Sequence, residues 1–360
     1  MFGVSVISWG FIAALVVAAV IAWVGWRLLK RRRYRTAATI VLSVAIVLST
    51  AGAATGVNRY FSYLPRFGDV VSVVDGSSYW PTFESVAALP LAQAAKRYPH
   101  GATVELKVPD NGSGFGTHDA LTWLPPQYFT EPHRRFPVVY LIHGSPGVPA
   151  DWFRGGQAGT TAAKLATKDE PMIVVAPRMS HNWLDDPECV DGKTEKVETH
   201  FLDDVIPTVD TVLRTVVSRN ARVIGGMSAG GYCALNLGLR HRNLFATIID
   251  MSGFTKPTHE GGLDALFGSG PKAKEKAKAN TPETYVPKIP VTPRTRIWLD
   301  CGTSDHEVLN QMDPLYRELV RRGFHAVLHL RPGAHTFHVW QPALMDSLTW
   351  VAPSLEQASR

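Results

Sequence analysis

The sequence predicts an α/β protein with a mostly parallel, eight-stranded sheet, helices on both of its faces, and two transmembrane helices before it. Two long uncharged apolar stretches occupy the first 57 residues, and a cluster of basic residues lies between them. From residue 102 onwards, apolar β-type runs alternate with helix-type segments, as they do in parallel sheets. One of these runs passes through a glycine-rich turn, which carries a serine, directly into a helix-type segment.

The two apolar stretches, residues 4–26 and 36–57, are each long enough to cross a bilayer as a helix. Residues 27–35 between them are strongly basic, and the positive-inside rule places such a short loop in the cytoplasm. We therefore expect residues 1–57 to be a membrane anchor and the rest of the chain to lie outside the cytoplasm.

A cleaved signal peptide is an alternative interpretation of the same region. Arg31–Arg35, the apolar run after it and the small residues Ala51-Gly52-Ala53 resemble a signal peptide with its cleavage site. Two retained helices are preferred, because a whole spanning segment already precedes that pattern.

The net charge of +6 comes entirely from the basic cluster. Six arginines and lysines and no acidic residue lie in the first 35 residues, so the remainder of the chain is neutral. A neutral catalytic region argues against nucleic acid as a partner.

The chain after the anchor divides into a linker and lead-in, residues 58–100, and a catalytic domain, residues 101–353. Residues 254–295, rich in Gly, Pro and Lys, interrupt the alternation and are expected to form an excursion over the carboxyl edge of the sheet. The predicted strands are Val104–Val108, Asp119–Leu124, Val138–Ile142, Met172–Ala176, Ala221–Gly225, Ala246–Met251, Arg296–Cys301 and Ala326–Leu330. The predicted helices include Leu202–Val217, Tyr232–Arg240, Val308–Arg322 and Val339–Val351.

The serine-bearing turn, Gly226–Gly230, fits the pattern Gly-x-Ser-x-Gly in the strand–turn–helix context of a nucleophile elbow. The glycines permit a sharp turn that lifts the Ser228 hydroxyl above the sheet. The N–H of Ala229, at the start of the helix, is then free to face an oxyanion.

A serine hydroxyl needs a base to take its proton, and the base is expected after the last strand. His335 directly follows the turn Pro332-Gly333 at the end of that strand and is the preferred candidate. His338, three residues later, is the alternative and is expected to begin the final helix.

The acid that orients the base should follow the seventh strand. Asp305 lies in the loop beyond Gly302 and is preferred over Glu307 and then Asp300, which is still within the strand. The chain order Ser228, Asp305, His335 is that of the α/β-hydrolase fold.

A second oxyanion donor is expected from the loop after the third strand, His143–Gly147. Pro146 has no N–H, so Ser145 is expected to supply the amide beside that of Ala229. Residues that follow other strands at the same edge are candidates for substrate contact. They are Arg178, His181, Trp183 and Phe254.

These segments together resemble the putative esterase family, which includes esterase D, feruloyl esterases and the mycobacterial antigen 85 mycolyltransferases. The resemblance covers residues 100–352, and the two front helices resemble those of exported actinobacterial members. It implies an α/β-hydrolase fold acting on esters or acyl groups without a metal or organic cofactor, and it supports the triad position by position. The segments that carry it are Trp123–Tyr128, Val139–Gly144, Asp151-Trp152, Glu198-Thr199, Gly226–Gly231, Asp300–Asp305 and Gly333–His335 with Trp340.

Two departures from the mycolyltransferases favour a more general esterase. The acid is Asp305 rather than a glutamate, and His143–Pro146 stands where they carry an Asp-Gly-Leu-Arg type of loop. The expected function is that of a membrane-anchored extracytoplasmic serine esterase acting on a lipid or cell-envelope ester. An acyltransferase of envelope lipids is the first alternative, and a non-catalytic envelope-binding protein is the second, against which the complete triad speaks.

Three cysteines, Cys189, Cys233 and Cys301, have no spacing typical of metal ligands. Cys233 and Cys301 are expected to be buried thiols. An oxidising compartment would permit one disulfide, but the sequence does not indicate which pair forms it.

Overall fold

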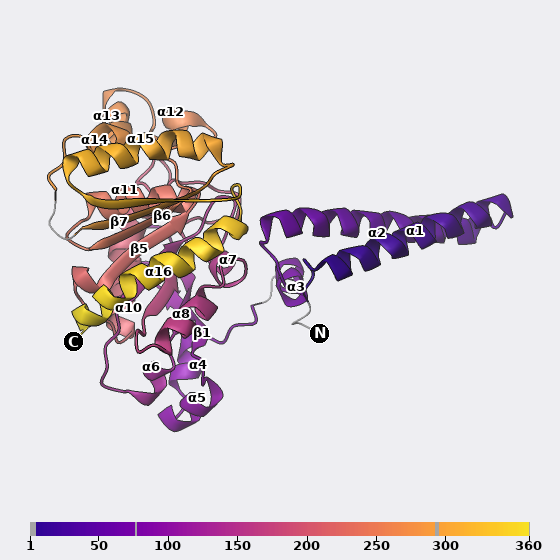
Figure 1. Cartoon of the computed structure of the whole chain (residues 1–360), viewed down its shortest axis with the longest axis horizontal. Coiled ribbons are helices and arrows are strands. Elements are labelled where there is room, and N and C mark those ends of the chain that lie inside the picture. Colours follow the sequence, from indigo (N-terminus) through magenta and orange to yellow (C-terminus); the bar gives the residue numbers. More distant parts are fainter. Residues whose placement is uncertain (1–4, 76–77, 292–294, 360) are drawn as a thin grey trace. The chain divides into compact units, whose positions relative to one another are not determined.

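The computed structural model describes residues 5–75, 78–291 and 295–359. The chain forms two compact units, Met1–Tyr79 and Trp80–Arg360, each of which is described by itself (Figure 1).

The first unit is a helical hairpin. Helix α1 spans Trp9–Arg31 and helix α2 spans Arg35–Phe61, and the indole of Trp23 donates a hydrogen bond of 3.1 Å to the hydroxyl of Ser49 across the hairpin. The predicted basic loop 27–35 is wrong at its start, because α1 continues through Arg31 and leaves a short turn. Lysine and arginine favour helix, so the positive charges extend the helix rather than end it. Val4, the predicted start of the first span, lies outside the described residues.

Both helices of the hairpin are long and apolar enough to cross a membrane, with mean hydropathy 2.2 and 2.0. Their apolar side chains point outward, and Ile21 and Val47 are 66% and 65% exposed. Helices near an N-terminus with these properties could be membrane spans or a signal sequence. A short helix, α3, Phe67–Asp75, follows them.

The second unit contains an eight-stranded sheet in the order β1-β2-β4-β3-β5-β6-β7-β8. Strands β3 to β8 are mutually parallel, whereas β2 runs antiparallel to both β1 and β4. The strands are β1 Ala102–Val108, β2 His118–Leu124, β3 Val138–Ile142, β4 Ile173–Ala176, β5 Arg222–Met227, β6 Thr247–Met251, β7 Arg296–Gly302 and β8 His325–Arg331. The eight predicted strands are all present, with ends shifted by one or two residues.

Helices cover both faces of the sheet, as the alternation of strands and helices along the chain predicts. Helices α11, Ala229–Arg240, and α15, His306–Arg322, lie on one side of the sheet, and α8, Ala158–Ala166, and α16, Phe337–Ser359, lie on the other (Figure 1). Helix α15 ends at Gly323, whose φ of 91° is the left-handed conformation that favours glycine.

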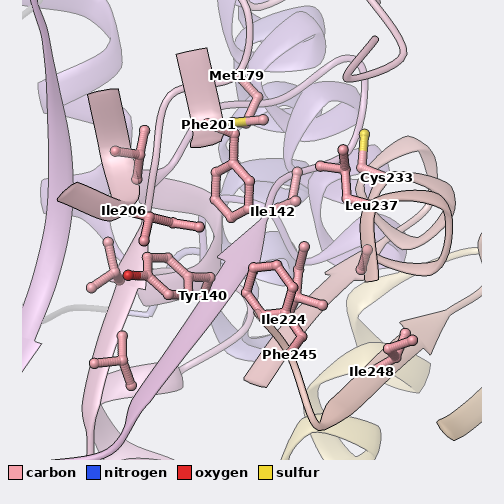
Figure 2. Close-up of a cluster of buried hydrophobic side chains, with 14 of the residues drawn as sticks. Tyr140, Ile142, Met179, Phe201, Ile206, Ile224, Cys233, Leu237, Phe245 and Ile248 are labelled. Carbon is pink, nitrogen blue, oxygen red and sulfur yellow. The ribbon is translucent and has the colours of Figure 1, made fainter. Parts of the chain in front are cut away.

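The core under α11 consists of aromatic and branched side chains (Figure 2). The Tyr140 ring meets the Phe201 ring edge-on at 5.4 Å, and Phe201 stacks on Phe245 at 6.1 Å. This packing fixes β3 and β5, whose carboxyl ends carry the candidate site.

One predicted helix, Leu202–Val217, differs in the structure. A π-helical turn, η1, His200–Val205, leads into α10, Ile206–Val212, and the chain is extended after that. The helix ends early because Thr215 forms a β-bridge with Phe136.

Parts of the chain assigned to linker or excursion contain short helices. In the lead-in, α4, Phe83–Ala87, and α5, Leu91–Arg97, belong to the second unit, because Val86 and Ala94 are buried in its core. The excursion contains α12, Gly262–Phe267, α13, Pro271–Ala279, and α14, Pro282–Tyr285, and its residues 292–294 lie outside the described part.

Candidate active site

Ser228 occupies the sharp turn between β5 and α11. Its backbone has φ 56° and ψ −127°, a conformation that L-residues adopt only when the surrounding structure enforces it. The Ser228 amide donates a 2.9 Å hydrogen bond to the carbonyl of Met251 at the end of the neighbouring strand β6. The turn is therefore held from the side, and the serine side chain stands at the carboxyl edge of the sheet.

Two glycines flank the turn because there is no room for a side chain. A Cβ placed on Gly226 would lie 1.9 Å from the carbonyl oxygen of Gly230. A Cβ on Gly230 would lie 2.2 Å from the carbonyl oxygen of Ile142 in β3. The pattern Gly-x-Ser-x-Gly thus follows from backbone packing at both of its glycines.

Three side chains from separate strand ends form a continuous chain of contacts. The Oγ of Ser228 lies 2.8 Å from the Nε2 of His335, and the Nδ1 of His335 lies 2.6 Å from the Oδ2 of Asp305. Ser228 and Asp305 are buried, whereas the His335 side chain is 35% exposed. The Trp340 ring packs edge-on against the imidazole at 4.9 Å. The structure thus brings together the three residues that the sequence proposes as nucleophile, base and acid.

The alternative residues lie elsewhere. Glu307 is exposed in the first turn of α15, and His338 is exposed at the start of α16. Asp300 is buried within β7 and accepts hydrogen bonds of 2.9 Å at both carboxylate oxygens from the Nε of Arg331. These contacts give Asp300 a partner of its own, away from the imidazole.

The loop after β3 packs directly on the serine. A Cβ on Gly144 would lie 3.2 Å from the Cβ of Ser228, so Ser145 follows immediately beside the nucleophile. Ser145 precedes Pro146 with a cis peptide bond. On the other side, Ala229 is the first residue of α11, where the helix leaves its amides without partners.

His143 fixes the geometry of this loop. The amide of Met179 donates to its Nε2 at 3.3 Å, so the proton lies on Nδ1, which donates to the carbonyl of Gly144 at 2.9 Å. Burial lowers the pKa of His143 to about 4, and the imidazole is therefore neutral at physiological pH.

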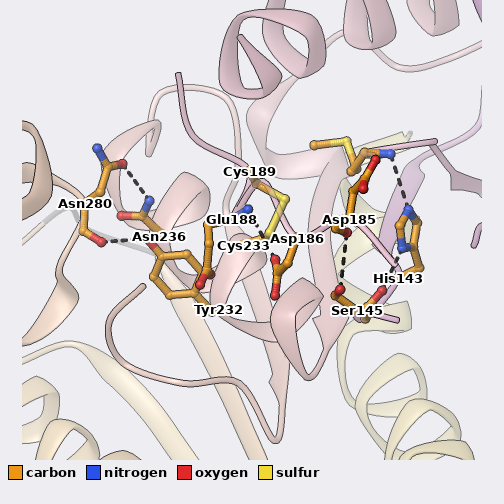
Figure 3. Close-up of a disulfide and its surroundings, with 12 residues drawn as sticks. His143, Ser145, Asp185, Asp186, Glu188, Cys189, Tyr232, Cys233, Asn236 and Asn280 are labelled. Carbon is orange, nitrogen blue, oxygen red and sulfur yellow. Dashed lines mark hydrogen bonds between the residues drawn. A yellow bond between two sulfur atoms is a disulfide. The ribbon is translucent and has the colours of Figure 1, made fainter. Parts of the chain in front are cut away.

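The segment after β4, residues 177–196, is called the β4 loop below. It lines a cavity of about 380 Å³ together with Ser145 and Pro146 of the β3 loop. The Ser145 hydroxyl donates to the carbonyl of Asp185 at 3.2 Å, and the Gly147 amide donates to the carbonyl of Trp183 at 2.8 Å. Figure 3 shows Ser145, Asp185 and His143 side by side. The β4 loop therefore packs against the loop that contains Ser145, and the cavity between them has neither Ser228 nor His335 in its lining.

A disulfide ties the β4 loop to the helix behind the nucleophile. Cys189 bonds to Cys233 of α11, and their Cα atoms are 5.5 Å apart (Figure 3). The expectation of a free thiol at Cys233 was wrong, and Cys301 alone is a free buried cysteine within the described residues. The pairing depends on how a long loop folds back onto α11, which no local pattern records.

The candidate substrate residues lie at the same edge of the sheet in different settings. Trp183 is exposed on the β4 loop, and Phe254 is partly buried against the core. The His181 ring stacks on Phe115 at 4.3 Å and its Nε2 lies 3.8 Å from an oxygen of Glu195. Arg178 is partly buried directly after β4.

The β4 loop carries a carboxyl group in an unusual state. Glu188 is buried and accepts a hydrogen bond of 3.2 Å from the hydroxyl of Thr258, and a further one from its amide. Burial, with the neighbouring charge of Asp186 adding to it, raises the pKa of Glu188 to about 8. Sequence reasoning missed Glu188, Phe115 and the role of His143, because their partners are distant in the chain.

Comparison with known proteins places the chain in a family. Residues 119–351 match the family model described as Putative esterase, which is more than half of the chain. The chain belongs to the putative esterase family. The matched region includes the strand ends that carry Ser228, Asp305 and His335.

Several proteins are similar to this chain in sequence or in fold. The uncharacterized protein Cgl0967/cg1104 of Corynebacterium glutamicum is 27% identical over 336 residues, which cover 89% of this chain and 77% of that protein. An acetyl esterase of Caldicellulosiruptor saccharolyticus is 24% identical over 237 residues, covering 60% of this chain and 83% of that enzyme. A solved ferulic acid esterase shares the fold with a TM-score of 0.61 at 22% identity, covering 71% of this chain and 98% of that one. The fold is therefore that of the α/β hydrolases, and the family supports a carboxylic ester hydrolase.

Proposed function

We propose that this family member is a serine esterase in which Ser228, His335 and Asp305 form the catalytic triad. The observation that carries the proposal is the unbroken series of contacts from the serine hydroxyl through the imidazole to the carboxylate, at 2.8 Å and 2.6 Å. A hydrolytic triad needs this order of partners, because the base must reach the nucleophile while the acid holds its other nitrogen.

In the proposed reaction, His335 takes the proton of Ser228 as the serine oxygen attacks the ester carbonyl. The amides of Ser145 and Ala229 stabilise the negative charge that develops on the carbonyl oxygen. The imidazolium, which Asp305 stabilises, then protonates the leaving alcohol. Water resolves the acyl-enzyme by the same steps in reverse.

The triad proposal is tested with a fluorophosphonate probe and a soluble chromogenic ester. We expect Ser228→Ala to abolish both labelling and ester cleavage. Ser252→Ala is a matched control, because Ser252 also follows a strand with positive φ but is completely buried, and its hydroxyl lies against the thiol of Cys301. Wild-type turnover in Ser228→Ala would refute the assignment, and an unlabelled wild-type protein would favour a non-catalytic binding role.

Transfer of the acyl group to another alcohol is the alternative fate of the acyl-enzyme. The two outcomes are separated by identifying products when a sugar or lipid alcohol is added to the assay. Release of free acid at an unchanged rate supports hydrolysis, whereas an acylated acceptor that forms at the expense of free acid supports an acyltransferase.

We also propose that α1 and α2 stay in the chain as membrane spans and that the catalytic unit lies outside the cytoplasm. Outward-facing apolar side chains and a basic turn support two spans with the turn in the cytoplasm. The Cys189–Cys233 disulfide supports an oxidising compartment. The match to the Corynebacterium protein covers a larger share of this chain than Trp80–Arg360 makes up, so that relative shares part of the first unit. An anchored esterase is suited to a lipid or cell-envelope ester.

Topology is tested with engineered cysteines and a membrane-impermeant maleimide on intact cells. Arg66→Cys, at an exposed position shortly after α2, should be labelled, whereas Lys30→Cys, at an exposed position near the end of α1, should react only after the cells are opened. The reverse pattern would place the catalytic unit in the cytoplasm, and a shortened chain without α2 would indicate a cleaved signal sequence.

A further inference from the structure

We propose that Arg178 is the centre of an anion subsite that binds a phosphate or carboxylate group of the ester substrate. The inference rests on the proposed esterase function and adds the class of substrate. It depends on where Arg178 lies, on its missing partner, and on the side chains around it.

Arg178 lies beside the candidate oxyanion loop. Strands β3 and β4 are parallel neighbours, and Tyr140 of β3 is paired with Val175 of β4. His143 follows Tyr140 by three residues and Arg178 follows Val175 by three residues, so both lie just beyond the carboxyl ends of the two strands. The two side chains are close enough for the Arg178 charge to lower the pKa of His143, after burial as the main cause. A group bound by Arg178 would therefore lie near an ester held at Ser145.

The guanidinium of Arg178 has no anionic partner in the described part of the chain. Burial lowers the pKa of Arg178, and the charge that favours its protonation, Asp119, is exposed and forms no ion pair with it. A partly buried charge without a partner is costly, so such a group commonly marks a place for a ligand.

Other buried arginines of the unit differ in this respect. Arg222 pairs with Asp210, and Arg331 pairs with Asp300. Other partly buried arginines, such as Arg214 and Arg219, donate to backbone carbonyls instead. The guanidinium of Arg178 has neither kind of partner within the described residues.

The side chains near Arg178 leave its charge unbalanced. His118 is lowered in pKa mainly by burial, with the charges of Arg178 and His181 adding to it. Asp204, a buried carboxylate of the same cluster, is already used by His200 at 2.7 Å, by the Asn111 amide at 2.8 Å and by the Ser113 hydroxyl. The lowered pKa leaves His118 neutral at physiological pH, and Asp204 is engaged elsewhere, so an arriving anion would balance the charge of Arg178.

The subsite is held rigidly before any ligand binds. The Phe115 ring lies between the rings of His181 and His200, at 4.3 Å and 4.2 Å. The backbone of Arg178 hydrogen bonds to the imidazole of His200. Because the surroundings are already ordered, binding an anion costs little conformational entropy.

The chemistry of the guanidinium indicates the ligand. Its planar fork matches two oxygens of a phosphate or carboxylate, and such charge-assisted bonds are stronger than neutral ones. Two sources share this chemistry: the headgroup of an anionic phospholipid ester, and a soluble ester that carries a phosphate.

The test compares two esters with the same acyl group, butyrylglycerol and butyrylglycerol 3-phosphate. We expect wild type to favour the phosphate ester by about 10- to 100-fold in kcat/KM, mainly through KM. Arg178→Gln should bring this ratio near one, and Arg178→Lys should give an intermediate value. Arg317→Gln is the control and should keep the wild-type ratio, since Arg317 is an exposed residue of α15 paired with Asp313.

A second arm distinguishes the sources by acyl release from vesicles of phosphatidylglycerol or of phosphatidylcholine. A preference for phosphatidylglycerol that Arg178→Gln loses indicates a lipid headgroup, whereas a preference limited to butyrylglycerol 3-phosphate indicates a soluble ester. Fluorophosphonate labelling shows that each variant is folded. If Arg178→Gln does not fold, the subsite is tested by Arg178→Lys and by competitive inhibition of wild type with glycerol 3-phosphate. An intermediate ratio in Arg178→Lys together with inhibition supports the subsite, whereas a wild-type ratio without inhibition contradicts it.

Two results would overturn the subsite. One is equal use of the neutral and the phosphate ester by wild type, and the other is a wild-type ratio in Arg178→Gln. In both cases cleavage of butyrylglycerol still supports the esterase. Failure of the esterase itself would instead appear as a wild-type protein that cleaves neither ester and is not labelled at Ser228.

Discussion

The loops that carry the proposed triad differ from the β4 loop in how they are held. The loop with Asp305 and the loop with His335 lie against each other through short backbone contacts, and the Ser304 amide donates to the carbonyl of Gly333 at 2.8 Å. A Cβ on Gly302 would lie 2.5 Å from that same carbonyl oxygen. The β4 loop instead depends on one disulfide, a buried carboxyl group and contacts to residues far along the chain.

This difference separates two tasks at one edge of the sheet. Close backbone packing leaves the triad loops with a single arrangement, which suits reacting groups that must stay within hydrogen-bond distance. The β4 loop is held by scattered backbone hydrogen bonds, such as that from Gly147 to Trp183, and by side-chain links. We therefore expect the chemistry to be sensitive to the first region, and stability and substrate choice to be sensitive to the second.

The largest effect is expected from the acid of the triad. Asp305→Asn should lower kcat by roughly 10³- to 10⁴-fold with little change in substrate binding, because the amide cannot stabilise the imidazolium or fix its tautomer. Steady-state kinetics on a soluble ester measures this.

Glu307→Gln is the matched control, because it changes an exposed carboxylate two residues away in the same loop-to-helix junction. It should stay near wild type. A severe loss in Glu307→Gln would show that the acid is misassigned, and full activity in both variants would indicate a Ser–His dyad.

A smaller effect, on stability, is expected from the link between Cys189 and Cys233. The bond closes a loop across a sequence separation of 44, so the variant with both cysteines changed to serine should lose about 2–4 kcal/mol of unfolding free energy. Urea denaturation with and without reductant measures the change. Reductant should weaken wild type and leave the variant unaffected, and an equal response of the two proteins would contradict a stabilising disulfide.

The smallest effect concerns Glu188 and pH. Its pKa of about 8 in the folded protein lies above its ordinary value of 4.5, so between these values the folded chain keeps a proton that the unfolded chain has released. Stability should therefore fall as pH rises from about 5 to 9. Urea denaturation at the two pH values measures the difference.

Glu188→Gln should remove this part of the pH dependence, because the amide oxygen can still accept from Thr258 and has no proton to lose. The variant should match wild type near pH 5 and be more stable near pH 9. An unchanged pH profile would show that another group, with Asp186 the first candidate, carries the linkage.

The sequence was informative where a feature depends on neighbouring residues. The strands follow from runs of apolar side chains, and the elbow follows from Gly226 and Gly230, which backbone packing requires. The position of Asp305 beyond the turn at Gly302 favours it as the acid, and the structure places it against His335.

Features that depend on distant partners were not predictable in this way. The helix expected to reach Val217 ends at Val212 because Thr215 forms a β-bridge with Phe136, which precedes β3 and is distant in the chain. The pairing of Cys189 with Cys233 requires the path of the β4 loop to be known. The stacking of Phe115 between two histidines has the same origin, since the segment before β2, the β4 loop and η1 meet only in the folded protein.

The hydrogen bond from His143 to the carbonyl of Gly144 has a consequence for electrostatics. In a trans peptide the C=O and the following N–H point in opposite directions, so fixing the Gly144 carbonyl also fixes the direction of the Ser145 N–H. The peptide dipole therefore has one fixed direction before an ester arrives, and in the proposed mechanism no reorientation energy is spent when charge develops. Because the pKa of His143 is about 4, this orientation persists across the neutral pH range.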